Sequence, residues 1–312
     1  MAVGATVANV EGTLDSRTAE KMLRQALPAA SLVDVISRTA GELSTVYEIR
    51  CTGTVPAVIV KIYQPRWRWK LRKEVHIYQL LAQHAIGPVP TILHADTDYL
   101  VMSLLPGVPL WDCRFDDDGL RSIYRQLGAL LRAVHAIDRD SYGYLTDRIL
   151  DPLPSNTAYM HRQFDKKLAE FGDLGGDPQL HSGIQHYVAE HGELFAQCAS
   201  AVLCHNDIHE GNLLVVDHPD GPALTGLIDV ENAIAADPLM DLAKADYYAM
   251  HGDPAKLSGL IAGYGELPDR WTDRVGVYRL FHALELWDWF AEIGKTARLP
   301  GIAADITAML DG

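Results

Sequence analysis

One stretch, Val202–Val215, places the tightest constraint on how this chain can fold. It reads Val-Leu-Cys-His-Asn-Asp-Ile-His-Glu-Gly-Asn-Leu-Leu-Val. The apolar residues at its two ends predict two buried strands, and the polar residues between them predict a loop. Downstream, the segment Gly226–Glu231 predicts another apolar strand that ends in carboxylates. Polar side chains held between buried strands at the edge of a sheet are well placed for chemistry.

The polar residues of these segments have a characteristic spacing: His205-x-Asp207-x-x-x-x-Asn212, followed by Asp229-x-Glu231. This spacing matches the catalytic loop of the protein-kinase-like fold, in which one aspartate orients the attacking hydroxyl while an asparagine and a second aspartate hold magnesium. Phosphoryl transfer depends on placing the reactants and compensating phosphate charge. Magnesium prefers hard oxygen ligands, which an amide and a carboxylate supply. The alternative is that Asp207 and Asn212 are ordinary turn formers.

Composition narrows the possible partners. The 312 residues are 48% hydrophobic, which allows a sizeable core and one or two domains. The formal net charge of −14 argues against nucleic acid as a partner, because phosphate backbones require a cationic surface. It fits attraction of a cationic small molecule, or simply a soluble acidic surface. We expect no membrane span, no signal peptide and reduced thiols, hence a cytoplasmic protein.

The first third of the chain predicts a small sheet with few helices. Asp15 can cap a helix that ends before Pro28, and Ile36–Ile49 reads as strand, turn and strand. A strand at Val55–Tyr63, a helix at Leu71–His84 and a strand from Tyr99 to a Pro-Gly break follow. We place a domain boundary at this break, which separates residues 1–103 from residues 104–312.

Lys61 lies inside the otherwise apolar strand Val55–Tyr63, so it needs an anionic partner or must reach solvent. Glu74 on the following helix is the predicted ion-pair partner, and nucleotide phosphates are the other candidate. The turn from Gly41 to Ser44 could cover those phosphates with its backbone N–H groups, although it also reads as an ordinary hairpin. The basic, aromatic segment Arg66–Lys70 reads as a solvated surface, with phosphate or nucleic-acid binding as the alternative.

The remainder predicts mostly helices. Apolar periodicity indicates a long helix from Asp118 to Ile137, two helices near residues 156–171 and 179–197 among loops, and a helix starting at Asp237-Pro238. Asp241 is expected to brace the catalytic loop or to cap this helix. The last strong helix, Val275–Ile293, carries three carboxylates at helical spacing, which either face an acceptor cleft or form a solvated acidic surface: Glu285, Asp288 and Glu292.

Taken in order, these motifs resemble the aminoglycoside phosphotransferase family, which is the small-molecule branch of the kinase-like fold and has choline, homoserine and sugar kinases as relatives. The resemblance implies an α+β, two-lobed protein-kinase-like fold with a small antiparallel-sheet N-lobe that binds nucleotide and a larger, mostly helical C-lobe that binds the acceptor. It is strongest over residues 203–243. It implies ATP and Mg²⁺ as cofactors and a small-molecule hydroxyl acceptor, with no nucleic acid or membrane as partner.

Residue by residue, the resemblance assigns Asp207 as the catalytic base or hydroxyl orienter, and Asn212 and Asp229 as the magnesium ligands. Lys61 would hold phosphates and Glu74 would position it, while His205 would be structural. The remaining nucleotide contacts are expected at Ser44, Ser103 and Leu105, and the remaining acceptor contacts at Glu231, Glu285, Asp288 and Glu292. Asn206 departs from the glycine that is frequent in the family. Val230-Glu231 replaces the Phe-Gly of protein kinases, which favours a small-molecule kinase.

We therefore expect an ATP-dependent O-phosphotransferase, with an aminoglycoside-type antibiotic as the favoured acceptor and resistance as its consequence. A metabolic kinase for a sugar, choline or homoserine is the alternative. A nucleotide-binding pseudokinase is disfavoured, because every expected polar position is filled.

Overall fold

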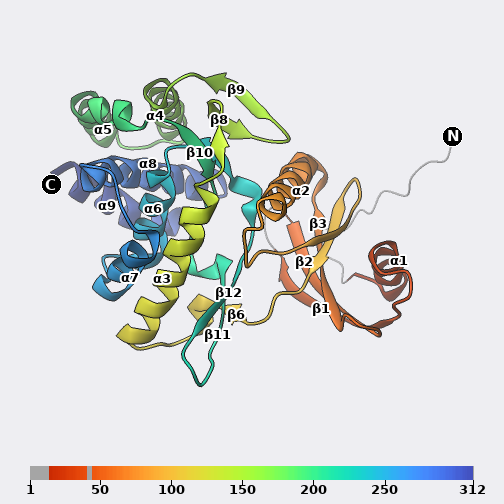
Figure 1. Cartoon of the computed structure of the whole chain (residues 1–312). Coiled ribbons are helices and arrows are strands. Elements are labelled where there is room, and N and C mark those ends of the chain that lie inside the picture. Colours follow the sequence, from red (N-terminus) through yellow and green to blue (C-terminus); the bar gives the residue numbers. More distant parts are fainter. Residues whose placement is uncertain (1–13, 41–43, 312) are drawn as a thin grey trace. The chain divides into compact units, whose positions relative to one another are not determined.

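The computed structural model describes residues 14–40 and 44–311, which divide into two compact units (Figure 1). The sheet unit contains the described residues up to Gln83 together with Val89–Leu105. The helical unit contains His84–Pro88 and the described residues from Pro106 onward. The chain thus leaves the sheet unit at Gln83, returns at Val89 and leaves it again after Leu105.

The sheet unit is built on one antiparallel sheet with strand order β1-β2-β3-β5-β4. Its strands are β1 (Leu32–Ala40), β2 (Ser44–Cys51), β3 (Ala57–Tyr63), β4 (Ile92–Ala95) and β5 (Tyr99–Ser103). Its helices are α1 (Ser16–Ala26) and α2 (Arg68–Gln83). Asp15 caps α1 by accepting hydrogen bonds from the backbone of Arg17 and Thr18, as the sequence predicted. The residues of the predicted turn at Gly41–Leu43 lie outside the described part of the chain.

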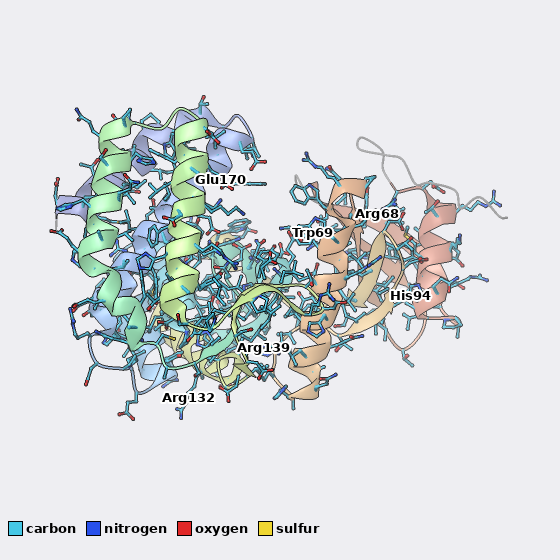
Figure 2. The ribbon with its side chains drawn as sticks, turned by 90° about the horizontal axis from the view of Figure 1, so that it is seen from above. Arg68, Trp69, His94, Arg132, Arg139 and Glu170 are labelled. Carbon is cyan, nitrogen blue, oxygen red and sulfur yellow. The ribbon has the colours of Figure 1, made fainter. Side chains whose placement is uncertain are left out.

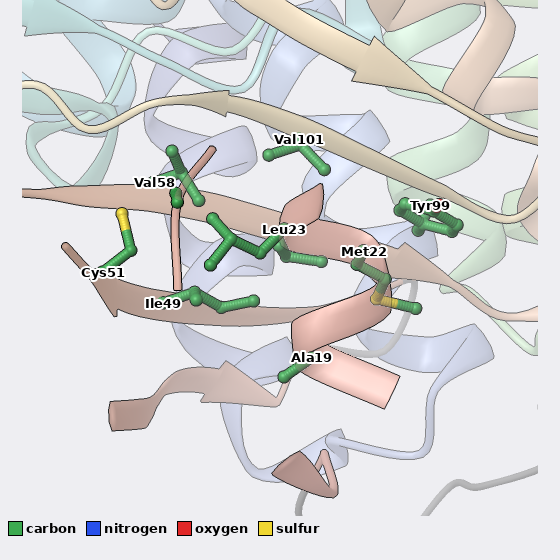
Figure 3. Packing of buried hydrophobic residues seen from close by; sticks show 10 residues of the cluster. Ala19, Met22, Leu23, Ile49, Cys51, Val58, Tyr99 and Val101 are labelled. Atoms are coloured by element: carbon green, nitrogen blue, oxygen red, sulfur yellow. The ribbon is translucent and has the colours of Figure 1, made fainter. Parts of the chain in front are cut away.

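Alternating residues of β3 and β5 face opposite sides of this sheet, so each helix covers one side. On one side, Met22 and Leu23 of α1 pack with Ile49, Val58 and Val101 (Figure 3). On the other side, Leu71 of α2 packs with the residues that alternate with these along β3 and β5, namely Tyr63, Leu100 and Met102. Lys61 lies two residues before Tyr63 on β3, so its side chain faces the same side of the sheet. This is the α2 side, where Glu74 lies.

The helical unit contains two further antiparallel sheets, with strand orders β7-β10-β13-β8-β9 and β12-β11-β6. The strands are β6 (Val108–Pro109), β7 (Asp138–Arg139), β8 (Tyr142–Leu145), β9 (Ile149–Leu153), β10 (Ala201–Cys204), β11 (Leu213–Val216), β12 (Ala223–Leu227) and β13 (Ile234–Ala236). The helices are α3 (Asp117–Val134), α4 (Asn156–Asp173), α5 (Pro178–His191), α6 (Leu239–Ala245), α7 (Pro254–Tyr264), α8 (Trp271–Glu292) and α9 (Leu299–Asp311). Within the described residues, no helix is long and apolar enough to cross a membrane.

Helices α3 and α7 approach each other so closely that glycines are required where they meet. A Cβ atom on Gly263 would lie 1.8 Å from the carbonyl oxygen of Arg125, and one on Gly128 would lie 2.1 Å from that of Leu260. A Cβ on Gly259 would lie 2.4 Å from the carbonyl oxygen of Arg121. We call these three glycines the glycine seam. The close approach fixes α3 against α7, and both helices carry residues that support the candidate site described below.

The expected α+β class is confirmed, with one sheet-rich and one mostly helical unit. Two expectations need correction. Residues 138–153 hold three short strands rather than loops, since β7 and β8 each pair with a strand far away in the sequence. Helices α7 and α9 were not predicted, so Val275–Ile293, which corresponds to α8, is not the last helix.

Candidate functional site

Two loops meet at the ends of paired strands in the helical unit. The first loop, residues 205–212, joins β10 to β11, and the second, residues 228–233, joins β12 to β13. Strand β10 pairs with β13, and β11 pairs with β12. Each loop therefore connects one of these strand pairs to the other. This topology brings the predicted motif residues of the two loops together.

Backbone hydrogen bonds hold the two loops in contact. The register Leu213↔Leu227 continues past the strands, because the N–H of Ile228 donates to the carbonyl oxygen of Asn212 at 3.0 Å. His205 bonds the carbonyl oxygen of Ile228 through Nε2 at 3.1 Å. Asp229 therefore directly follows a residue that is tied to both His205 and Asn212.

Side chains add further links around Asp207. Asn232 donates through Nδ2 to Oδ2 of Asp207 at 3.1 Å, and Asn206 donates to the carbonyl oxygen of Asn232 at 3.3 Å. Asn212 donates through Nδ2 to the carbonyl oxygen of Asp207 at 2.9 Å. Asp207, Asn212 and Asp229 are thus brought into one small region by a continuous set of bonds.

Two residues of these loops have left-handed backbone conformations, Asn206 with φ of 60° and Asp229 with φ of 66°. L-residues rarely adopt this region, and asparagine and aspartate tolerate it better than most. The asparagine at position 206 is therefore compatible with the backbone conformation that glycine adopts most easily. The turn at Asp229 redirects the chain between β12 and β13.

The buried carboxylate of Asp241 braces the first loop, which is one of the two roles expected for it. Its two oxygens accept the backbone N–H groups of His205 at 2.8 Å and Asn206 at 2.6 Å. His135, at the end of α3, contacts the same carboxylate at 3.0 Å, and Tyr264 of α7 contacts His135 at 2.9 Å. Although burial by itself raises the pKa of Asp241, these hydrogen bonds and the nearby histidines lower it overall. The carboxylate therefore stays ionised.

His205 has the structural role that the resemblance implied. Burial lowers its pKa, so the ring is neutral at neutral pH. The backbone N–H of Asp207 donates to Nδ1 at 3.2 Å, which leaves Nε2 to carry the proton toward Ile228. The imidazole thereby fixes the backbone on either side of the loop.

Several supporting residues have no sequence signal of their own. Asn232, His135 and Glu210 were not predicted, although Asn232 directly follows the recognised Asp-x-Glu pattern. Glu210 is bound by Lys256 of α7 at 2.7 Å and by the hydroxyl of Tyr124 of α3 at 3.2 Å. The glycine seam therefore positions two helices that both hold the first loop.

The sheet unit contains the predicted Lys61–Glu74 ion pair. Nζ of Lys61 lies 2.9 Å from Oε2 of Glu74, and their side chains are 7% and 1% exposed. The hydroxyl of Tyr63 also donates to Glu74. Breaking such a buried pair from one side leaves an uncompensated charge. Lys61 is therefore held in place by its own unit.

The other residues expected to contact nucleotide lie on strands of this unit or just beyond them. Ser44 begins β2 and pairs with Tyr63 of β3. Ser103 ends β5, and its backbone N–H already donates to the carbonyl oxygen of Thr91 at 2.9 Å. Leu105, two residues later, is half-buried. The backbone N–H of Ser103 is therefore already paired within the unit.

The three carboxylates of α8 do not share one environment. Oε2 of Glu285 lies 2.6 Å from Nζ of Lys244, while Glu292 is exposed. Asp288 is 3% exposed, and the nearest cation, Nζ of Lys167, lies 3.7 Å away without a hydrogen bond. A single acidic stripe is therefore not present on α8. Glu231 is buried in the second loop, two residues after Asp229.

The pKa values of the two interior acids shift in opposite directions. Burial raises the pKa of Glu285, but Lys244 and His282 outweigh it, so the pKa falls below its usual range. Burial raises the pKa of Asp288 to about 7, because Lys167 only partly offsets it and Glu170 and Glu285 add to it. Glu170 lies on α4 (Figure 2).

The donor chemistry of the two loops fits a magnesium ion. Because the amide nitrogen of Asn212 is bound to the Asp207 carbonyl, the amide oxygen forms the other arm of that side chain. The carboxylate of Asp229 follows the adjacent strand. Both are hard oxygen donors, and magnesium needs only a few of these from a protein because it keeps some of its water.

Comparisons with known proteins agree with this geometry. A family model described as "Phosphotransferase enzyme family" matches residues 35–274. No curated protein sequence matches the chain. A crystal structure of aminoglycoside phosphotransferase APH(4)-Ia is similar with a TM-score of 0.72 at 15% identity, covering 95% of this chain and 99% of that chain. A thermostable mutant of that protein has been solved in a ternary complex with ADP and hygromycin B.

Two further solved structures have related folds. A putative fructosamine-3-kinase from Thermobifida fusca YX-ER1 gives a TM-score of 0.70 at 18% identity and covers 94% of this chain and 99% of that chain. Macrolide 2'-phosphotransferase MphH from Brachybacterium faecium gives a TM-score of 0.67 at 18% identity, with coverage of 94% and 97%. At these identities the similarity establishes the fold, which confirms the kinase-like architecture that the resemblance implied.

Proposed function

Because the chain belongs to the phosphotransferase enzyme family, we propose that it transfers the γ-phosphate of ATP to a hydroxyl group of a small, polar, cationic molecule. Membership of that family makes the chain a phosphotransferase that acts on an alcohol group, with ATP and Mg²⁺ as its cofactors. The proposal concerns the acceptor and the residues that act.

The observation that carries the proposal is the bonded pair of loops around Asp207, Asn212 and Asp229. We assign to Asp207 the orientation of the acceptor hydroxyl, because its carboxylate is fixed by Asn232 and can accept a hydrogen bond from a substrate. The acceptor oxygen attacks the γ-phosphorus, the bond from that phosphorus to ADP breaks, and the hydroxyl proton leaves through Asp207 or to water.

We assign the metal to Asn212 and Asp229. When bound, Mg²⁺ supplies positive charge that compensates the phosphate oxygens. On the nucleotide side, Lys61 is the phosphate ligand and Glu74 positions it, in keeping with their buried ion pair. Ser44, Ser103 and Leu105 are assigned to backbone contacts with the nucleotide.

For the acceptor we favour an aminoglycoside-type molecule. The formal net charge of −14 attracts cations. In the helical unit, Asp288 is a candidate for binding an ammonium group, because its carboxylate oxygens have no hydrogen bond and the cation beside it, Lys167, lies 3.7 Å away. Glu231 and Glu285 are further candidates for binding ammonium groups, while exposed Glu292 is the weakest.

The decisive experiment replaces Asp207 by asparagine, which keeps the shape of the side chain. We expect transfer to fall by roughly 10³-fold, while ATP with Mg²⁺ still raises the melting temperature as in the wild type. Asp217→Asn is the matched control, because Asp217 is exposed in the connection between β11 and β12. Turnover by Asp207→Asn at the wild-type rate would refute the assignment.

A metabolic small-molecule kinase is the second candidate, since a putative fructosamine-3-kinase is among the similar structures. ADP release should be measured over a panel of hygromycin B, streptomycin, a macrolide, a fructosamine, choline and homoserine. A metabolite that exceeds every antibiotic by orders of magnitude in kcat/KM would select this candidate. Binding of ATP without transfer to any acceptor would instead indicate a pseudokinase.

A further inference from the structure

An exposed indole stands beside the loop that carries Asp207. Trp111 lies in the short 3-10 helix Leu110–Asp112 of the helical unit, and this residue is 54% exposed while Leu110 is buried. An indole carries a large apolar area, and leaving it in water forfeits the gain from burial. The proposed transfer reaction gives this residue no role so far.

The indole is seated in a fixed position. Its ring stacks on the imidazole of His209, with 5.8 Å between the ring centroids and an angle of 20° between the planes. One edge of the indole covers Gly211, where a Cβ atom would lie 2.4 Å from the ring. Gly211 has no positive φ, so the glycine is needed for the indole rather than for the backbone.

His209 connects the indole to Asp207. Its Nδ1 accepts the backbone N–H of Gly211 at 3.1 Å, and its Nε2 lies 3.9 Å from Oδ1 of Asp207. A single imidazole therefore separates the indole from the carboxylate. The intervening Glu210 is bound by Lys256 and Tyr124, so the loop is anchored to α7 and α3 while it supports Trp111.

An acceptor whose hydroxyl reaches Asp207 must extend over the groups beside that carboxylate, and Trp111 provides an exposed apolar surface there. We propose that the indole of Trp111 is the platform on which a saturated, hydroxyl-bearing ring of the acceptor stacks its C–H face. This inference rests on the proposed function and narrows its acceptor to ring compounds. A rigid aromatic side chain suits this role, because it offers a flat contact at a low cost in conformational entropy.

The competing explanation is that Trp111 only covers Gly211 and His209. Two variants distinguish the explanations: Trp111→Phe keeps a flat ring, and Trp111→Leu keeps apolar cover without one. For the best ring acceptor of the panel above, we expect KM to rise roughly 10-fold in Trp111→Leu and only about 2- to 3-fold in Trp111→Phe. The KM for ATP should stay unchanged in both, and kcat should stay within about 3-fold.

Trp69→Leu is the control, because Trp69 is an exposed tryptophan at the start of α2 (Figure 2). It should leave the acceptor KM unchanged. Equal acceptor KM values for the wild type and Trp111→Leu would overturn the platform while leaving the proposed function intact. A decrease in melting temperature, together with similar increases in the KM for ATP and the KM for the acceptor, would show that Trp111 is purely structural.

The acceptor panel itself supplies the remaining outcomes. If choline or homoserine, which lack a ring, is the best acceptor, the platform is refuted although the chain is still a kinase. If no acceptor is phosphorylated while ATP still binds, the proposed function fails, and the assignment of Trp111 fails with it.

Discussion

The carboxylate of Asp241 is a single group that orients two consecutive backbone amides of the loop before Asp207. Both of its oxygens accept N–H groups, and one also contacts His135. An ionised carboxylate is suited to this role because all its hydrogen-bonding positions are acceptors. Its neutral amide analogue would turn a donor toward another donor.

Asp241→Asn should therefore lower the free energy of unfolding by about 2 to 3 kcal/mol and reduce kcat by at least roughly 10-fold. Denaturant unfolding and steady-state turnover measure the two effects. Asp246→Asn serves as the control, because Asp246 pairs with a half-exposed Arg279 at 3.2 Å and should cost under about 1 kcal/mol. Unchanged stability and turnover in Asp241→Asn would show that the brace is dispensable.

The pKa of Asp288 predicts how the stability of the protein depends on pH. Its pKa is raised to about 7 in the folded protein, mainly by burial, so the folded state binds a proton that the unfolded state has already released. Stability should therefore decrease as the pH rises from about 4 to about 7 and stay level above that. Asp288→Asn removes this penalty, so it should be more stable than the wild type by roughly 1 to 2 kcal/mol at pH 8.

The comparison of wild type and Asp288→Asn should be made by chemical unfolding at pH 4.5, 6 and 8. Near pH 4.5 the two proteins should differ little, since the wild-type carboxyl is protonated there as well. A stability difference that is independent of pH would contradict the assignment of the titration to Asp288.

At the scale of elements, the glycine seam joins α3 to α7, and both helices hold the first loop. Helix α3 supplies Tyr124 and ends beside His135, and α7 supplies Lys256 and Tyr264. Glycine in a helix interior costs about 1 kcal/mol relative to alanine, so three of them here indicate that close approach outweighs helix propensity.

Gly263→Ala should destabilise the protein by more than about 3 kcal/mol and lower activity, because its methyl group would overlap the backbone of Arg125. Gly276→Ala is a matched control, since Gly276 lies within α8 with nothing within 4 Å of the added Cβ. This control should be neutral or more stable by up to about 1 kcal/mol. Thermal unfolding compares the two, and equal melting temperatures would show that the helices can separate at little cost.

The same elements explain which parts of the fold could be predicted from sequence. Helices with a strong apolar stripe, such as α3, are predicted closely. Helix α7 was missed because its glycines and its apolar residues blur the stripe, although Asp253 followed by Pro254 is a recognisable start signal. Strands β7 and β8 were missed because they pair with β10 and β13, which lie far away in the sequence, and β9 in turn pairs with β8.

The candidate site likewise contains residues that the sequence indicates and residues that only the structure shows. Asp207, Asn212 and Asp229 could be singled out because the motif of the kinase-like fold has a fixed spacing along the chain. The supporting contacts, such as Asn232 with Asp207 and His135 with Asp241, join segments that are distant in the sequence. Spacing on α8 likewise suggested one acidic side, whereas packing gave Glu285 and Asp288 different neighbours and left Glu292 in solvent.

At the scale of the whole molecule, the net charge of −14 predicts how salt affects acceptor use. Long-range attraction of a cationic acceptor weakens as ionic strength rises, because the Debye length shortens. Between about 50 and 300 mM salt, the KM of a cationic acceptor should rise several-fold, whereas that of a neutral acceptor should change little. Steady-state kinetics with one acceptor of each kind measures this, and identical salt responses would argue against electrostatic attraction.

The glycine seam has a consequence for how acceptor preference can diverge. Two helices whose backbones touch cannot slide or tilt without collision. A mutation therefore cannot shift, by small steps, the side of the first loop that these helices hold. Adaptation to a new acceptor is then left to side chains that can change size without disturbing that contact, Trp111 among them. Selection for a different acceptor should accumulate substitutions at such positions while Gly128, Gly259 and Gly263 persist.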